Sequence, residues 1–413
     1  MNTDKHRLQK PTSCIRVHPS SAAKFIYIAL ASAALAFVTL GQKASNQNAS
    51  CCGRDIAVAR TIADPYPVFN GIAVDASNNI VVMTDGNRKS LLIYDRTASV
   101  SGPTEETVPL RQIIGPETNI GFVAGVVVDP KSREVYAVNN DIEDTMLVMP
   151  YQSKGNARPR RLLSVPHQAW GMALSPNHEL AVTVELHNGI VFYAPSANGI
   201  DAPLRHIQGP ATGLADPHGI AWDGVHNEIA VANHGNFRGL LKNIGLGCVP
   251  AVPGDETEVG KFEPPSVTIY TAAAKDDARP SRKIQGPATK LDWPMGVAVD
   301  ATHNEIAVAN NGDNSILIFR RTSAGDVAPL RTIHGAHTGI NRPMGLAIDA
   351  KNDEIWVANF GDHTALAFSR TDDGDRAPKR VIRSAPAGTP SAGFGNPMAV
   401  AYDSKREEIL VPN

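Results

Sequence analysis

The chain of 413 residues is poor in cysteine, with 4 in total. Cys14 precedes an apolar segment, while Cys51, Cys52 and Cys248 follow it and lack a C-x-x-C spacing. These cysteines therefore form neither a disulfide framework nor a zinc ribbon. The chain also lacks heptads, long helical periodicity and a βαβ rhythm, and this excludes coiled coils and parallel α/β folds.

Positive charge is not in excess either. After residue 50 the chain holds 33 basic and 40 acidic residues, a net charge of −7. Nucleic-acid binding requires a basic patch, so we expect no nucleic-acid partner. The sequence also has no G-x-S-x-G, H-E-x-x-H or EF-hand motif, and Gly245–Gly247 lacks the Lys-Ser/Thr of a phosphate loop.

The N-terminal region has the pattern of a targeting element. Residues 1–24 form a basic n-region, and Phe25–Gly41 is a run of 17 residues without charge. Such a run is either a cleaved signal peptide or a retained membrane anchor, and both alternatives stay open. We expect residues 42–55 to be a linker and only residues 25–41 to contact a membrane. Everything after Gly41 is then exported, to the periplasm, the cell surface or the extracellular space.

One hairpin recurs seven times. Each copy reads as an apolar run, a polar turn and a second alternating run, as in GIAVDASNNIVVMTD at 71–85 and GVAVDATHNEIAVANN at 296–311. Successive copies are 54, 46, 48, 77, 49 and 54 residues apart, close to the length of a four-stranded propeller blade. The anchor position of the copies is occupied by Asp75, Asp129, Ser175, Asp223, Asp300, Asp349 and Asp403.

A third strand and an Arg-containing fourth strand follow each complete copy. The last hairpin ends at Asn413, and Val58–Ile62 aligns with the fourth strand. We therefore expect residues 56–413 to form one all-β, seven-bladed β-propeller, with N- and C-terminal strands sharing a blade; six blades is the alternative.

The repeat resembles the NHL-repeat propellers and, more loosely, the gluconolactonase-like and YVTN-type propellers. Residues 71–95 match best, with Asp75, the Asn78-Asn79 turn and Asp85-Gly86-Asn87. The resemblance implies the fold and leaves the function open, because one fold hosts many activities.

Two positions of the repeat have a structural interpretation. The recurring Arg of the fourth strand is expected to pair with acids or pack on the next blade. Ten residues after each anchor the side chain is polar, and we expect turn capping there, with a ligand-facing ring as the alternative. The residues at this second position are Asp85, Asn139, Glu185, Asn233, Asn310, Asn359 and Asn413.

Positions that differ between otherwise similar copies indicate a site. They concentrate in blades three and four, and blade four also carries a long insertion, 234–265. We expect a ligand to lie off the axis over these two blades, on the top face, where the second-to-third and fourth-to-first loops converge. The candidate ligand-binding residues are His218, Asn233, His234, Glu185 and Trp170.

The sequence favours a non-catalytic binding or interaction scaffold, without a cofactor, whose partner is a protein, a glycan or a small molecule. The alternative is a divalent-metal-dependent hydrolase or lyase, as the resemblance to gluconolactonase-type propellers implies, with an ion such as calcium. No catalytic residue is assigned. The metal ligands in that alternative are Glu185, Asn233, Asn310 and Asp85.

Overall fold

The computed structural model describes residues 64–140, 143–235, 237–238 and 261–391, together with residues 24–26, 401–403 and 408–410. The chain forms two compact units, Pro65–Asn396 and Met1–Asp64 with Pro397–Asn413. Within the described residues the helices are two short 3-10 turns, η1 (Pro116–Thr118) and η2 (Pro287–Thr289). Neither of these is long and apolar enough to cross a membrane.

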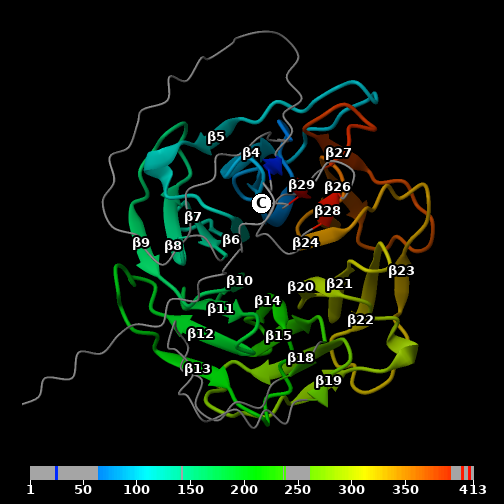
Figure 1. Ribbon diagram of the computed structural model, residues 1–413. Coiled ribbons are helices and arrows are strands. Elements are labelled where there is room, and N and C mark those ends of the chain that lie inside the picture. Colours follow the sequence, from blue (N-terminus) through cyan, green and yellow to red (C-terminus); the bar gives the residue numbers. More distant parts are fainter. Residues whose placement is uncertain are drawn as a thin grey trace, which may run out of the picture. The chain divides into compact units, whose positions relative to one another are not determined.

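The unit Pro65–Asn396 contains six antiparallel sheets of four strands, which are the blades of a β-propeller (Figure 1). Blades one to three consist of β2 (Phe69–Asp75), β3 (Ile80–Asp85), β4 (Ser90–Asp95) and β5 (Arg111–Ile114); β6 (Val123–Asp129), β7 (Glu134–Asn139), β8 (Thr145–Pro150) and β9 (Arg161–Ser164); β10 (Ala169–Leu174), β11 (Leu180–Val184), β12 (Gly189–Tyr193) and β13 (Arg205–Gln208).

Blades four to six follow the same order of strands, from the inner strand outward. They consist of β14 (Pro217–Asp223), β15 (Glu228–Asn233), β18 (Ser266–Thr271) and β19 (Arg282–Ile284); β20 (Pro294–Asp300), β21 (Glu305–Asn310), β22 (Ser315–Arg320) and β23 (Arg331–Ile333); β24 (Pro343–Asp349), β25 (Glu354–Asn359), β26 (Thr364–Ser369) and β27 (Arg380–Arg383).

The expected all-β propeller is confirmed, but the expectation of seven blades is wrong. The inner strands contact one another in the closed order β2, β6, β10, β14, β20, β24 and again β2. The ring therefore closes between blade six and blade one, without a blade shared by the chain ends. Six blades, the alternative weighed from the sequence, is the observed number.

Close backbone packing around the axis distinguishes the six copies in the ring from the seventh copy. Every inner strand has a glycine four residues before its anchor, and a Cβ there would come within 3.0 Å of a carbonyl oxygen in the next blade. The seventh copy has Ala399 at this position, which adds the Cβ that the packing excludes. The six glycines of the ring are Gly71, Gly125, Gly171, Gly219, Gly296 and Gly345.

The hairpin of the seventh copy belongs to the other unit. There β28 (Ala401–Asp403) pairs antiparallel with β29 (Glu408–Leu410), and β1 (Lys24–Ile26) pairs parallel with β29. The segment Val58–Ile62, which we expected to complete this blade, lies outside the described residues. So does the expected targeting run apart from its first two residues, Phe25 and Ile26.

Apolar clusters between the blades form the core. The second strand of most blades is buried along its whole length because neighbouring blades cover both of its faces. At the closure of the ring, Phe69 and Tyr94 of blade one share a cluster with Trp356 of blade six. The core is therefore continuous across the closure.

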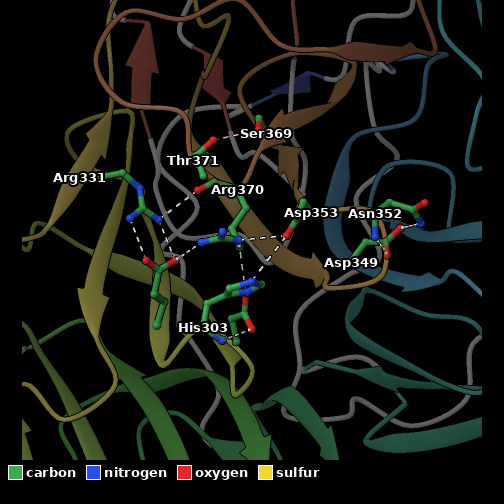
Figure 2. Close-up of polar contacts among 10 residues, drawn as sticks. His303, Arg331, Asp349, Asn352, Asp353, Ser369, Arg370 and Thr371 are labelled. Atoms are coloured by element: carbon green, nitrogen blue, oxygen red, sulfur yellow. Dashed lines mark hydrogen bonds and ion pairs between the residues drawn. The ribbon is translucent and has the colours of Figure 1, made fainter.

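The recurring arginine has the structural role that the sequence predicts. In five blades it pairs with a glutamate at the start of the second strand, in the pairs Arg161–Glu134, Arg205–Glu179, Arg282–Glu228, Arg331–Glu305 and Arg380–Glu354. A second arginine, from the following blade, often reaches the same carboxylate. Arg370 of blade six, for example, donates to Glu305 at 3.2 Å and to Asp353 at 3.1 Å (Figure 2).

Candidate functional site

The polar position at the end of the second strand is mostly structural. In blade five, Asn310 Oδ1 accepts from the backbone N–H of Asp292 at 2.7 Å, and its Nδ2 donates to Ser315 Oγ at 3.1 Å. We call this pair of hydrogen bonds the bracket. It joins the loop before the inner strand to the third strand of the same blade. Asn139, Asn233 and Asn359 repeat it. The position therefore has a structural role, although these asparagine side chains connect a loop to a strand and do not cap the adjacent turn.

Asp85 in blade one accepts in the same place, from the backbone N–H of Val68 at 3.1 Å and from Ser90 Oγ at 2.9 Å. It is fully buried. Burial raises the pKa of Asp85 to about 6, against the lowering effect of these hydrogen bonds. Its oxygens are thus occupied inside blade one.

Glu185 is the exception among the six blades. Its longer side chain reaches both neighbouring blades: Oε1 lies 3.2 Å from Nε2 of His218 in blade four and 3.5 Å from Nδ2 of Asn140 in blade two. The Glu185 side chain is 14% exposed and the His218 side chain 6% exposed. In the other blades this position forms the bracket within its own blade. In blade three it forms a buried contact between blades three and four.

His218 lies between two acidic residues and an aromatic ring. Its Nδ1 donates to the backbone oxygen of Asp216 at 3.1 Å and lies 3.7 Å from Asp216 Oδ1. The ring of Trp170 is 4.8 Å away at an angle of 59°. Burial favours the neutral imidazole, but the carboxylates of Glu185 and Asp216 outweigh it, so the pKa of His218 is raised above its ordinary range.

His234 stacks on His218, with ring centroids 3.5 Å apart and planes at 20°. Its Nδ1 lies 3.4 Å from Asp216 Oδ2, and its Nε2 contacts Met295 Sδ. Burial and the neighbouring charge of His218 lower the pKa of His234 to about 4. The two stacked rings therefore differ in basicity, and His218, which lies between Glu185 and Asp216, has the higher pKa.

These rings belong to a row that crosses four blades. Phe122 of blade two lies 6.2 Å from Trp170, and at the other end Trp293 of blade five stacks on His234 at 5.3 Å and 10°. The residues in between are Trp170, His218 and His234, from blades three and four. Trp293 is 58% exposed, so the row ends in an accessible indole.

The backbone beside this row is strained. Seven residues before the anchor, four blades have a non-glycine residue in the left-handed region, a conformation that is uncommon and clusters at functional sites. These residues are Gln168, Asp216, Trp293 and Arg342, with φ of 66°, 55°, 48° and 48°. Two of them, Asp216 and Trp293, contact the histidine pair.

The structure brings together four of the five residues predicted for ligand binding: Trp170, Glu185, His218 and His234. It does not bring in Asn233, whose side chain is the bracket of blade four. The sequence reasoning did not select Asp216, Trp293 and Met295. They occupy the entry to the inner strand, with Met295 as the second residue of β20, and the copies vary most at this entry.

The metal ligands expected for the hydrolase alternative are occupied elsewhere. Asp85, Asn233 and Asn310 use their side-chain oxygens in brackets of three different blades, and Glu185 faces His218. A different cluster could hold a metal ion. Within the described part of the chain, the side chains of Asp216, His218 and His234 bring three ligand atoms within 4.8 Å of one another.

Known proteins add little to this description. No family model matches the chain, and no curated protein matches it in sequence. Among solved structures, the chain is similar to Kuenenia stuttgartiensis hydrazine synthase, with 14% identity and a TM-score of 0.49 over 74% of this chain and 78% of that one. The resemblance to NHL-repeat propellers stays a prediction.

Proposed function

We propose that this propeller is an extracytoplasmic binding module that takes its ligand on the top face, over blades three to five and off the axis. The observation that carries the proposal is the exposed indole of Trp293, stacked on His234 at the end of a row of five rings. An indole fixed by stacking loses little conformational freedom when a ligand covers it.

The groups beside the indole define the chemistry of the ligand. Trp293 and Trp170 offer flat apolar faces, while the carboxylates of Glu185 and Asp216 are hydrogen-bond acceptors within the same row. This combination suits a small molecule with donor groups and a face that can stack on an indole, such as an aromatic amine or the C–H face of a sugar.

Binding to a panel of soluble oligosaccharides and aromatic amines, followed by calorimetry and tryptophan fluorescence, tests the proposal. For any panel member that binds the full chain, Trp293→Ala and Trp170→Ala should each weaken binding at least tenfold. Val225→Ala is the control, because Val225 is 72% exposed and lies in the turn between β14 and β15, away from the row. The proposal is wrong if no member binds or if both tryptophan variants bind normally.

The location is proposed from the sequence alone, from the basic residues 1–24 and the apolar run Phe25–Gly41. Protease treatment of intact spheroplasts should digest the propeller. A propeller protected from protease until the membrane is lysed would contradict export.

A further inference from the structure

Blade four brings two imidazoles and a carboxylate together. Nδ1 of His218 lies 3.7 Å from Asp216 Oδ1, and Nδ1 of His234 lies 3.4 Å from Asp216 Oδ2. Both histidines are buried, and the Asp216 side chain is 13% exposed. We propose that His218 Nδ1, His234 Nδ1 and the Asp216 carboxylate bind one divalent transition-metal ion of the zinc class.

The donor atoms select the class of metal. Calcium takes six to eight oxygen ligands, whereas two imidazole nitrogens with one carboxylate suit zinc, cobalt, nickel or iron. Three protein ligands also leave a fourth position of a tetrahedral ion open for water or for a bound molecule. This set shares no residue with the oxygen ligands expected from the sequence, which were Glu185, Asn233, Asn310 and Asp85, although Glu185 contacts His218.

Binding of an ion requires the two stacked rings to separate and tilt. A tetrahedral ion with bonds of about 2.0–2.2 Å holds its ligand atoms roughly 3.4 Å apart. The ligand atoms of this cluster already lie within 4.8 Å of one another, so they must approach by about 1 Å. Because His218 and His234 are stacked, with planes at 20°, the rings must tilt until their Nδ1 atoms converge.

Groups around the ligands hold them in place. Glu185 accepts from Nε2 of His218, as carboxylates do beside metal-bound histidines. When the ion binds, Nδ1 of His218 loses its proton and exchanges its hydrogen bond to the Asp216 backbone oxygen for the metal. The Asp216 loop is fixed by its N–H, which donates to Asn188 Oδ1 at 2.7 Å, and by its carbonyl, which accepts from the His234 N–H at 3.1 Å. Glu185 is thus a positioning residue and not a ligand.

The inference does not depend on the proposed ligand function, because an ion can bind whether or not a molecule covers Trp293. The test therefore uses metal alone. The full chain, purified without a polyhistidine tag and stripped with a chelator, is titrated with Zn²⁺ by calorimetry and with Co²⁺ by absorption spectroscopy. We expect one high-affinity equivalent and a Co²⁺ spectrum of tetrahedral or five-coordinate geometry with nitrogen ligands.

Variants assign the site. Asp216→Asn, His218→Gln and His234→Gln should each weaken Zn²⁺ binding by more than 100-fold, and Glu185→Gln by about 10- to 100-fold with the Co²⁺ spectrum altered. His226→Gln is the matched control, since His226 pairs with Asp223 in the same blade at 2.8 Å but has no second histidine beside it. Thermal melting of each metal-free variant identifies any that fails to fold, and the remaining variants then decide.

The proposal is overturned if the stripped wild-type chain shows no saturable one-to-one binding of Zn²⁺ or Co²⁺. It is also overturned if folded His218→Gln and His234→Gln proteins bind the ion as tightly as the wild type. The second result would place the ion elsewhere in the chain. If metal removal does not change the binding of a panel ligand, the metal site and the proposed ligand function are independent of each other.

Discussion

A Cβ atom on Gly345 of blade six would lie 2.7 Å from the carbonyl oxygen of Asn70 in blade one. This contact is the sixth of its kind around the axis, and it joins the last complete blade to the first. The ring therefore closes by the same backbone packing that connects its other blades. Gly345 and Asn70 meet at the closure between the inner strands. Arg96 of blade one and Glu354 of blade six form an ion pair across the same closure, further from the axis.

Gly345→Ala should weaken this closure. The added methyl group cannot move away from a backbone oxygen, so we expect the free energy of unfolding to fall by about 1–3 kcal/mol. Urea denaturation followed by circular dichroism measures this. Gly102→Ala is the control, because a Cβ there meets its nearest atom at 3.7 Å, an ordinary contact. Equal stability of the two variants would show that the glycine ring does not limit the packing.

Arg96→Ala should destabilise the outer part of the closure. Arg96 Nη1 lies 3.0 Å from Glu354 Oε2 and 3.5 Å from Asp349 Oδ2, and both carboxylates are almost fully buried. Its loss leaves them less well paired, although Lys379 still contacts Glu354 at 3.1 Å. We expect a loss of about 2 kcal/mol. Arg158→Ala, which removes a side chain 80% exposed in its pair with Glu117, should change stability by less than about 0.5 kcal/mol.

Asp85→Asn should stabilise the protein at alkaline pH. The pKa of Asp85 rises from 3.8 to about 6 on folding. A raised carboxyl pKa favours the folded state below pH 3.8, and this contribution is lost as the pH increases through 6. At pH 8 the buried charge therefore costs about 3 kcal/mol at most. The variant should gain a similar amount at pH 8 and almost nothing at pH 4.

Four other blades have asparagine at the position of Asp85. The asparagine side chain of the Asp85→Asn variant should therefore fit this position and form the same hydrogen bonds. The reverse change, Asn139→Asp, is the matched control and should lower stability at pH 8 more than at pH 4. Denaturant titrations at the two pH values measure both variants. A pH-independent difference would show that folding does not raise the pKa of Asp85.

A chain limited to residues 65–396 should fold. Every contact that we describe at the closure, from Gly345 and Asn70 to Arg96 and Glu354, lies within it. We expect one cooperative unfolding transition within about 1 kcal/mol of the propeller transition in the full chain. Loss of cooperativity in differential scanning calorimetry would mean that residues outside 65–396 are needed for the ring.

The sequence predicts the blades well because the repeat constrains them. The anchor aspartates, the recurring arginines and the polar bracket position have the same partners in most blades, so they recur at fixed spacing. The predicted number of blades was wrong because the seventh copy has the hairpin pattern of the repeat but departs from it at single positions. Ala399, at a position where six copies have glycine, was readable in the sequence. Its meaning requires knowing that this atom faces the next blade.

The site could be predicted only in part, for a similar reason. Glu185 and His218 stand out as residues without counterparts in the other copies, and they do meet. Asp216 and Trp293 reach the histidine pair from loops of two different blades. Their backbone is in the left-handed region, which cannot be predicted from the periodicity of the sequence. Asn233 was predicted together with His234 because both lie at the end of the second strand of blade four, yet the Asn233 side chain turns into its own blade.

The arginine contacts between blades give the ring a direction. Arg96, Arg321 and Arg370 each reach back to a glutamate of the preceding blade, so each of these contacts runs from an arginine of one blade to a carboxylate of the blade before it. A ring opened between blades six and one would expose Arg96 on one end and Glu354 with Asp349 on the other. These ends complement those of a second opened molecule. Partial unfolding at high concentration should therefore produce head-to-tail chains and domain-swapped dimers.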